Sequence, residues 1–209
     1  MFKPLLISAF LLTGAHTALA DTATTYDFTG FNELDIAAGV EVNFTTAPDY
    51  SIVADFHRGG PDELKIRQEG ERLYISRKML SGSGDHLRVT LTISAPELTT
   101  IEASSGSSLR AEGLTAETFE LRVSSGATTD LYGTCGTLKL KVSSGGNADA
   151  RSLECLNVSA TASSGGAAKA FASQSALSKT SSGGSVDIWG NPPDRSANRS
   201  MSGGSTDFH

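Results

Sequence analysis

The stretch "KLKVSSGGNADA", residues 139–150, joins two short alternating runs through a Ser-Ser-Gly tripeptide. Apolar and polar residues alternate on both sides of the tripeptide, which is typical of β-strands with one buried face. Glycine accepts the positive φ that a sharp reversal demands, and neighbouring serines can hydrogen-bond the turn backbone. The tripeptide is therefore predicted to form a corner between two strands.

The same tripeptide recurs through the second half of the chain. It stands at 104–106, 124–126, 143–145, 163–165 and 181–183, with a degenerate Met-Ser-Gly copy at 201–203. The spacings between successive glycines are 20, 19, 20, 18 and 20 residues. Self-similarity at such a period indicates stacked repeats. We predict an all-β fold in which residues 98–209 form a β-helix (β-solenoid) of about 18–20-residue coils.

Positions at fixed distances from each glycine share a chemical character. Side chains seven, five and three residues before a glycine, and three and five after it, are mostly apolar or small and are predicted to face inward. The column five residues before the glycine contains Ile101, Leu121, Leu140, Ala160, Ser178 and Asn198, and the last residue of the column seven before it is Ser196. Because Ala, Thr, Ser and Val dominate these positions, we expect a thin, tightly closed coil.

Residues 21–97 are predicted to form an irregular N-terminal β section without a visible repeat. The alternating runs at 40–44, 50–56 and 87–94 predict strands, and 64–78 predicts two strands joined by a turn at Gly70. The segment "GNPPDRSAN", residues 190–198, is predicted to be a loop that bulges out of the last coil. We expect either its "NPPDR" part or another subunit to cover the end of the solenoid.

The first twenty residues are predicted to be a signal peptide. Lys3 precedes an apolar run that ends in Ala-Leu-Ala, which predicts cleavage after Ala20. The run is broken by polar residues and is too short to span a bilayer. We therefore expect a periplasmic or extracellular mature chain without a transmembrane segment. The formal net charge of −6, which loss of Lys3 makes −7, disfavours a nucleic-acid partner.

The two cysteines each lie ten residues before a corner glycine. Cys135 and Cys155 therefore occupy the same site in consecutive coils, about 4.8 Å apart. That separation suits a disulfide, and a secreted chain favours one. The alternatives are two buried free thiols or, less favoured without a C-x-x-C motif, a redox centre.

Two columns of charged residues are predicted to point outward. Four residues after each glycine stand Arg110, Asp130, Asp149, Lys169, Asp187 and Asp207; four before stand Glu102, Arg122, Lys141, Thr161, Lys179 and Arg199. Two interpretations remain open. The columns are a solvated face, or Asp130, Asp149, Arg122 and Lys141 form a ligand-binding ladder for a polysaccharide or an envelope protein.

No residue pattern predicts a catalytic, cofactor-binding or metal site. The mature chain has three histidines and no nucleophile-elbow motif. The "GG" corners differ from calcium-binding β-roll repeats because the aspartate follows the first glycine by four residues rather than five, a third glycine is missing and the period is too long. The alternative is a polysaccharide lyase or hydrolase that uses the Asp column, although Trp189 is the single tryptophan and no aromatic-lined groove is visible.

The segments "FNELDIAAGVEVNFTTAPDYSIVADF" (31–56) and "LKIRQEGERLYISRK" (64–78), followed by the Ser-Ser-Gly coils, resemble the autotransporter adhesin head GIN domain family of bacterial envelope proteins. The likeness covers residues 26–208. It implies a signal-peptide-bearing bacterial protein with a β-helix-like fold and an adhesin-like, noncatalytic role. The family provides no catalytic residues to transfer to this sequence.

Overall fold

The structure is a computed structural model that describes residues 23–78, 87–199 and 202–209, so the predicted signal peptide and its cleavage site lie outside the described residues. Within them, the single helical element is a 3-10 turn, η1 (Pro61–Glu63). The strands are β1 (Ala23–Thr25), β2 (Glu33–Ile36), β3 (Glu41–Thr46), β4 (Ser51–Arg58), β5 (Leu64–Glu69), β6 (Arg72–Arg77), β7 (Arg88–Ala95), β8 (Thr100–Ala103), β9 (Ser108–Val123), β10 (Thr128–Val142), β11 (Asn147–Ala162), β12 (Ala167–Thr180), β13 (Ser185–Trp189), β14 (Asp194–Arg199) and β15 (Ser205–Phe208). No helix in these ranges is long and apolar enough to cross a membrane.

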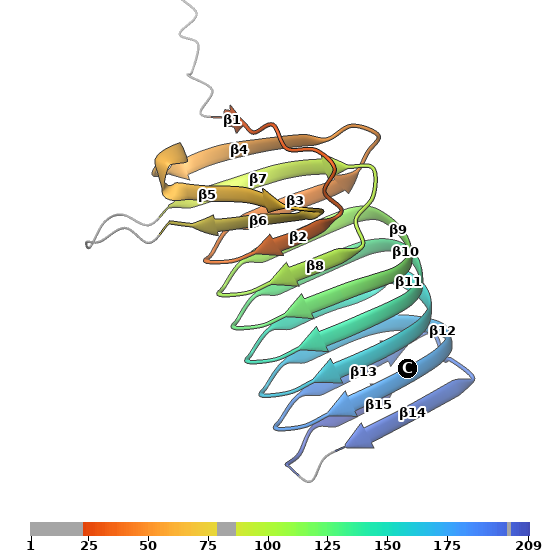
Figure 1. Ribbon diagram of the computed structural model, residues 1–209. Coiled ribbons are helices and arrows are strands. Elements are labelled where there is room, and N and C mark those ends of the chain that lie inside the picture. The colour runs from red at the N-terminus through yellow and green to blue at the C-terminus, as the bar shows by residue number, and fades with distance from the viewer. Residues whose placement is uncertain (1–22, 79–86, 200–201) are drawn as a thin grey trace, which may run out of the picture.

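The chain winds into a β-solenoid, as the spacing of the glycines predicts (Figure 1). Strands β9 to β12 each pass around most of one coil and pair in parallel with the strand of the next coil. Leu121 lies beside Leu140, and Leu140 beside Ala160, in this register. Residues about twenty apart in sequence therefore occupy equivalent sites in neighbouring coils.

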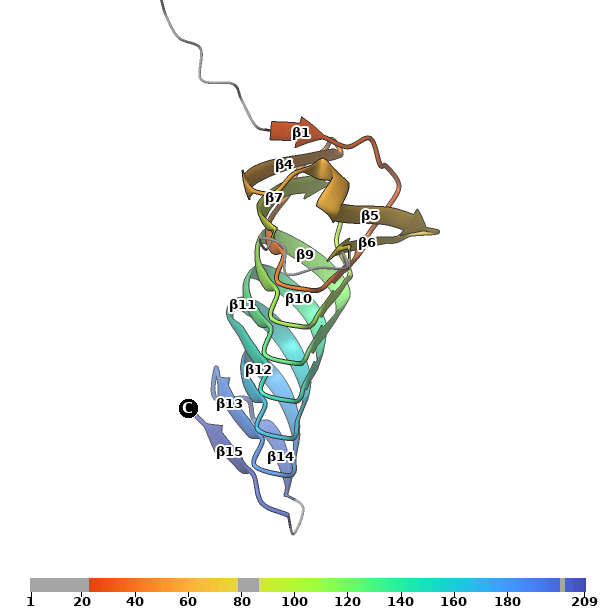
Figure 2. The same ribbon diagram turned by 90° about the vertical axis from the view of Figure 1, so that its left-hand side faces the viewer.

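Each Ser-Ser-Gly corner separates two walls of the solenoid. We call the wall whose strands run into the corners the pre-corner wall; it contains β5, β6, β2, β8, the second halves of β9 to β12, and β14. The post-corner wall contains β1, β4, β7, β3, the first halves of β9 to β12, β13 and β15. Figure 2 shows the corners from the front, with β13 and β15 on one flank and β14 on the other.

The corners are tight turns in which two consecutive residues have positive φ. In the third corner φ is 51° at Ser144 and 71° at Gly145, and the Gly146 N–H donates to the Ser143 carbonyl at 2.9 Å. Positive φ at both central residues is the pattern of a type I′ turn, which suits the twist of β-strands. The Gly126 N–H also donates to the Ser144 carbonyl at 3.2 Å, so backbone hydrogen bonds connect successive corners.

The N-terminal section contains a further coil that has no Ser-Ser-Gly. Ala38 (φ 61°) and Gly39 (φ 71°) make the same corner between β2 and β3. In the register, Leu34 lies beside Ile101 and Val42 beside Leu109. The repeat is invisible to a spacing test because β4 to β7 are inserted between this corner and the next. Strands β6 and β7 stack above β2 and β3 and extend both walls.

Most of the predicted inward positions are confirmed. Leu121, Leu140, Ala160 and Ser178 are all fully or almost fully buried. The predicted strands at 40–44, 50–56, 64–78 and 87–94 correspond to β3, β4, β5 with β6, and β7. The interior of the coils is therefore the single continuous core of the described residues.

The prediction for the last coil is wrong in two respects. Residues 194–198 do not belong to a bulging loop, because they lie in strand β14, which pairs in parallel with β12. Ser196 and Asn198 do not face a core, because every residue of β14 is exposed.

The register of β14 also differs by one residue from the prediction. Asn198, rather than Arg199, lies beside Lys179, and Arg199 lies beside the buried Thr180. The shift occurs because one more residue separates β14 from its corner glycine than in the other coils. Arg195 and Arg199 therefore take the register of inward-facing residues, and the Arg195 guanidinium carbon lies 5.7 Å from the Phe208 ring centroid. Inward-facing charges at the last strand disfavour pairing with another sheet edge.

Candidate functional site

The first predicted charged column is present on the post-corner wall. Each member of the column is the register partner of the next member in the neighbouring coil. In order along the solenoid, the members are Arg110, Asp130, Asp149, Lys169, Asp187 and Asp207. The side chains alternate with buried residues of the same strands, so they point outward. The structure thus brings Asp130 and Asp149 to adjacent sites on one wall.

Several charges of this wall are paired with each other. Arg151 donates from Nε and Nη2 to the Asp149 carboxylate at 2.6–3.1 Å. These hydrogen bonds hold the pKa of Asp149 below its usual value, although partial burial opposes the shift. Arg110 pairs with Glu112 at 2.7 Å and donates to the Tyr132 hydroxyl at 2.9 Å. Much of the electrostatic potential of this wall is therefore neutralised locally.

An aromatic stack at the C-terminal end of the same wall was not predicted, because Trp189 has no aromatic neighbour along the chain. Trp189 stacks on His209 with ring centroids 4.6 Å apart, and Phe171 lies beside Trp189 in the register. The Arg151 guanidinium carbon lies 5.2 Å from the Trp189 ring, and His209 lies 3.5 Å from Asp187. Stacked contacts along the axis occupy ring faces, so this cluster is a poor open platform for a ligand. The sequence does contain a signal for this cluster, because Phe171, Trp189 and His209 each stand six residues after a corner glycine.

The second charged column lies on the pre-corner wall, on the other side of the corners. Arg122 and Lys141 are neighbours there. Arg122 pairs with Glu120 at 3.1 Å and with Glu102 at 3.9 Å. The four predicted ladder residues therefore form two pairs on two walls, and the structure does not bring all four to one surface.

Near the N-terminal end of this wall, Asp35 occupies a small groove with Tyr74 and Lys65. Burial raises the pKa of Asp35, and repulsion from Glu102 in the next coil raises it further. The sequence could not reveal this residue, because its environment depends on the register between β2, β6 and β8. In the described part of the chain, no three His, Cys, Asp or Glu side chains come together in a way that could hold a metal ion.

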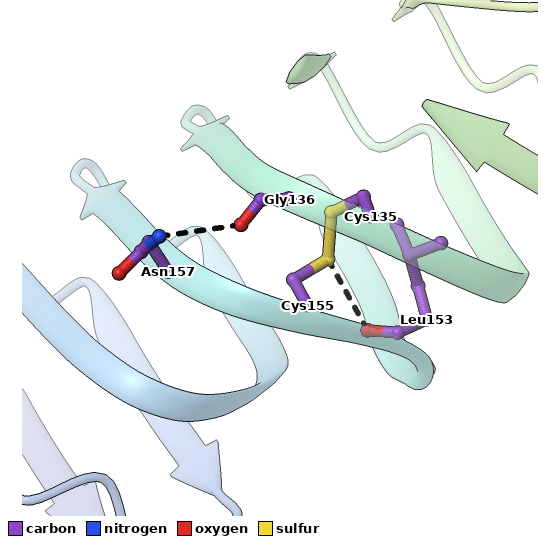
Figure 3. Close-up of a disulfide and its surroundings, with 5 residues drawn as sticks. All are labelled: Cys135, Gly136, Leu153, Cys155 and Asn157. Atoms are coloured by element: carbon purple, nitrogen blue, oxygen red, sulfur yellow. Dashed lines mark hydrogen bonds between the residues drawn. A yellow bond between two sulfur atoms is a disulfide. The ribbon is translucent and has the colours of Figure 1, made fainter. Parts of the chain in front are cut away.

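The predicted disulfide is present on the side of the coil that joins the two walls (Figure 3). Cys135 of β10 and Cys155 of β11 have Cα atoms 4.4 Å apart, and both side chains are buried. The Asn157 amide also joins these two strands, donating to the Gly136 carbonyl at 3.4 Å. The alternative of two free thiols is therefore excluded.

With this geometry established, sequence comparison identifies the family. The family described as "Putative auto-transporter adhesin, head GIN domain" matches residues 30–192. The chain belongs to this family. No curated protein is significantly similar to it.

Solved structures share the fold of this head GIN protein at low sequence identity. A "putative adhesin" from Bacteroides fragilis is 18% identical, with a TM-score of 0.70 over 89% of this chain and 94% of the other. A "putative adhesin" from Parabacteroides merdae is 13% identical, with a TM-score of 0.52 over 90% and 95%. A "putative lipid binding protein" from Parabacteroides distasonis is 12% identical, with a TM-score of 0.51 over 90% and 96%. At these identities the likeness establishes the fold alone.

The head GIN match contains every residue of the two ladder pairs and both bridged cysteines. The match ends before β14, so this strand, whose register is shifted by one residue, lies beyond the matched residues.

Proposed function

We propose that this head GIN protein is a noncatalytic, adhesin-like component of the bacterial cell envelope that binds a polysaccharide or another envelope protein along its solenoid walls. One observation carries the proposal: equivalent outward side chains recur in register, as Asp130 beside Asp149 and Arg122 beside Lys141. Membership of the adhesin-head family supports it.

The mechanism would be repeated weak contact. Neighbouring coils lie about 4.8 Å apart, so a wall presents similar groups at a fixed interval to a polymer with its own repeat. A single exposed charge pair contributes only about 0.2–1 kcal/mol. Once one contact forms, the next is intramolecular and benefits from a high effective concentration. Affinity should therefore rise steeply with ligand length.

The enzyme alternative would require two carboxyl groups, one acting as a general acid and the other as a base or nucleophile. Glycoside hydrolases pair a carboxylate with a protonated acid whose pKa is raised. On the post-corner wall Arg151 instead lowers the pKa of Asp149, which is the opposite of what a general acid needs. This supports the noncatalytic reading.

An extracytoplasmic location follows from the predicted signal peptide and is supported by the disulfide, because such bonds persist in oxidising compartments. Expression of the full chain in a bacterial host should release a mature protein that begins at Asp21. N-terminal sequencing of the periplasmic fraction tests this, and a cytoplasmic chain that retains Met1 would contradict it.

Binding can be tested with immobilised bacterial surface polysaccharides, both neutral and charged, and with oligosaccharides of increasing length. The expected result is binding that strengthens with length and is weakened in Asp130→Ala with Asp149→Ala or in Arg122→Ala with Lys141→Ala, with unchanged circular dichroism. Release of reducing ends or unsaturated products would favour the enzyme alternative. If both double variants bind as tightly as wild type, the two charged columns are a solvated face rather than a ligand-binding ladder.

A further inference from the structure

The C-terminal half of the pre-corner wall carries a strip of unpaired cations. We call Lys139, Lys141 and Lys179 the lysine strip; all three are exposed and lie on β10 and β12. Across the ranges that the structure describes, none of the three has a carboxylate within ion-pair distance. Lys141 and Lys179 occupy one column, with Thr161 between them.

Three acidic residues of this wall lie toward its other end, whereas Asp194 lies on β14. Glu33 pairs with Arg72 at 2.6 Å, and Glu102 lies 3.7 Å from Arg72. Glu120 lies beside Lys139 in the register, but its carboxylate pairs with Arg122 at 3.1 Å. The wall is therefore neutralised near the N-terminal end and cationic near the C-terminal end, in a chain whose formal net charge is −6.

Two grooves lie along the columns of Lys139 and Lys179. The larger, of about 570 Å³, contains Ser159, Leu177 and Ser196, which continue the column of Lys139. The smaller, of about 330 Å³, contains Thr161, Lys179, Asn198 and Arg199. The Ser159 and Thr161 hydroxyls and the Asn198 amide thus lie within the two columns that contain the lysines.

The polar lining of the larger groove is held in place by hydrogen bonds. The Ser175 hydroxyl donates to the Asn157 side-chain oxygen at 2.6 Å, while the Asn157 amide donates to the Gly136 carbonyl. These bonds connect β10, β11 and β12 and fix the orientation of the amide. Asp194 is the single acid among the residues that line either groove.

We infer that this half of the pre-corner wall binds an acidic polysaccharide whose sugars carry carboxylates. The inference rests on the proposed binding function and specifies its site and ligand class. Sugar hydroxyls match the donors and acceptors of the grooves, and the partly exposed Leu177 can contact the apolar face of a sugar ring. Lys141 and Lys179 stand two coils, or about 9.6 Å, apart, which suits a chain with a negative charge at that interval.

Other classes of ligand fit this surface less well. A single-stranded nucleic acid is usually held by stacking of its bases on aromatic side chains, whereas no aromatic residue lines either groove. A lipid chain needs an apolar tunnel or groove, whereas the smaller groove has no large apolar side chain and the larger has Leu177, Val158 and Pro193 among polar groups. An acidic peptide would use the lysines but not the hydroxyl-lined grooves.

The test measures binding of the mature, oxidised protein to three polymers by calorimetry at low and physiological salt. The probes are polygalacturonate, its highly methyl-esterified form, which keeps the sugars but loses most charges, and poly-glutamate. The site variant is Lys141→Gln with Lys179→Gln. Its matched control is Lys65→Gln with Lys78→Gln, two exposed lysines away from the strip. A second variant, Ser159→Glu, adds a carboxylate at an exposed groove position.

The inference expects polygalacturonate to bind best, with affinity falling roughly tenfold in the site variant and in Ser159→Glu but not in the control. Equal binding of the esterified polymer would overturn the requirement for charge, and equal binding of poly-glutamate would overturn the sugar requirement. If polygalacturonate binds and the site variant binds it as well as wild type, this site is wrong while the proposed function survives. If none of these polymers nor any polymer of the surface panel binds wild type, the proposed function fails with it.

Discussion

The coils nearer the N-terminus, which contain Leu121 and Leu140, are called the upper coils, and those nearer the C-terminus, which contain Ala160 and Ser178, the lower coils. The two groups share one register but differ in the side chains that fill their interior. The inward column that begins with Ile101, Leu121 and Leu140 continues as Ala160 and Ser178, all of them buried. Burial of a Leu side chain contributes about 1.5–3 kcal/mol, which Ala cannot match. The lower coils must therefore draw their stability from other interactions.

The corners show what those interactions are. The residue after each corner glycine is Ser107 and then Ala127 in the upper coils, but Gly146, Gly166 and Gly184 in the lower ones. A Cβ added to Gly184 would lie 2.4 Å from backbone atoms of Ala162. Lower coils thus gain close backbone approach where they lose apolar volume. The lesson is that one coil geometry can be maintained either by filling the interior or by closing it.

Leu121→Ala should give the largest loss of stability. Removing a fully buried Leu leaves a cavity in a core that cannot collapse around it, so we expect about 3–4 kcal/mol less free energy of unfolding. Urea titration followed by circular dichroism measures the loss. The counterpart Ala160→Leu, at the same column position, should cost about 1–3 kcal/mol by overpacking. Tolerance of Leu at 160 would show that the lower interior is loose rather than closed.

Loss of the disulfide should come second. The bond joins residues 20 apart in sequence, at the boundary between the upper and the lower coils. Its removal should therefore lower the free energy of unfolding by about 3 kcal/mol. Cys135→Ala with Cys155→Ala is the appropriate variant, because Ala116 and Ala172 occupy the same site in the adjoining coils.

Hydrogen exchange of this double variant locates the effect. Protection of backbone amides should fall more in β11 to β13 than in β3 and β9, because the lower coils bury less apolar surface and are less stable without the disulfide. Equal loss of protection along the stack would mean that the solenoid unfolds as one unit and that the two halves do not differ in stability.

Gly184→Ala should cost about 2 kcal/mol. The added methyl group would overlap the backbone of the preceding corner, and neither strand can move without breaking the ladder. The matched change in an upper coil is Ala127→Gly, which creates no overlap and should cost about 1 kcal/mol or less. Thermal unfolding compares the two. A harmless Gly184→Ala would show that the lower corners have room to separate.

The sequence predicted the parts of this fold that depend on local spacing. Cys135 and Cys155 could be paired because both stand at one distance from a corner glycine. The coil at Gly39 could not be found, since its neighbours in space are separated from it by an inserted section. The register of Arg199 was missed because a single extra residue before the corner changes the face of every side chain in β14.

The candidate site was less predictable than the fold. Spacing indicated that Asp130 and Asp149, and likewise Arg122 and Lys141, are neighbours, but not that the two pairs lie on different walls. Nor could it show which charges are already neutralised, because pairs such as Arg72 with Glu33 depend on the inserted N-terminal strands.

The smallest effects concern two half-buried carboxyl groups, one in each region, whose pKa values shift in opposite directions. Arg151 lowers the pKa of Asp149, so this ion pair stabilises the protein above the ordinary value of 3.8 and stops doing so as pH falls through the lower folded value. Asp149→Asn should therefore be about 0.5–1 kcal/mol less stable than wild type at neutral pH. The difference should vanish in strong acid. Urea midpoints measured across pH test this.

Asp35→Asn should show the opposite behaviour. Burial and repulsion from Glu102 raise the pKa of Asp35, so the folded state carries a penalised charge above that raised value. Asn removes the charge and should stabilise the protein by a few tenths of a kcal/mol at neutral pH. The gain should shrink as pH falls through the folded value and be gone below 3.8, where both states are protonated. Destabilisation by Asn at neutral pH would mean that the Asp35 carboxylate makes a favourable contact with Arg72 or Arg67 that outweighs its burial.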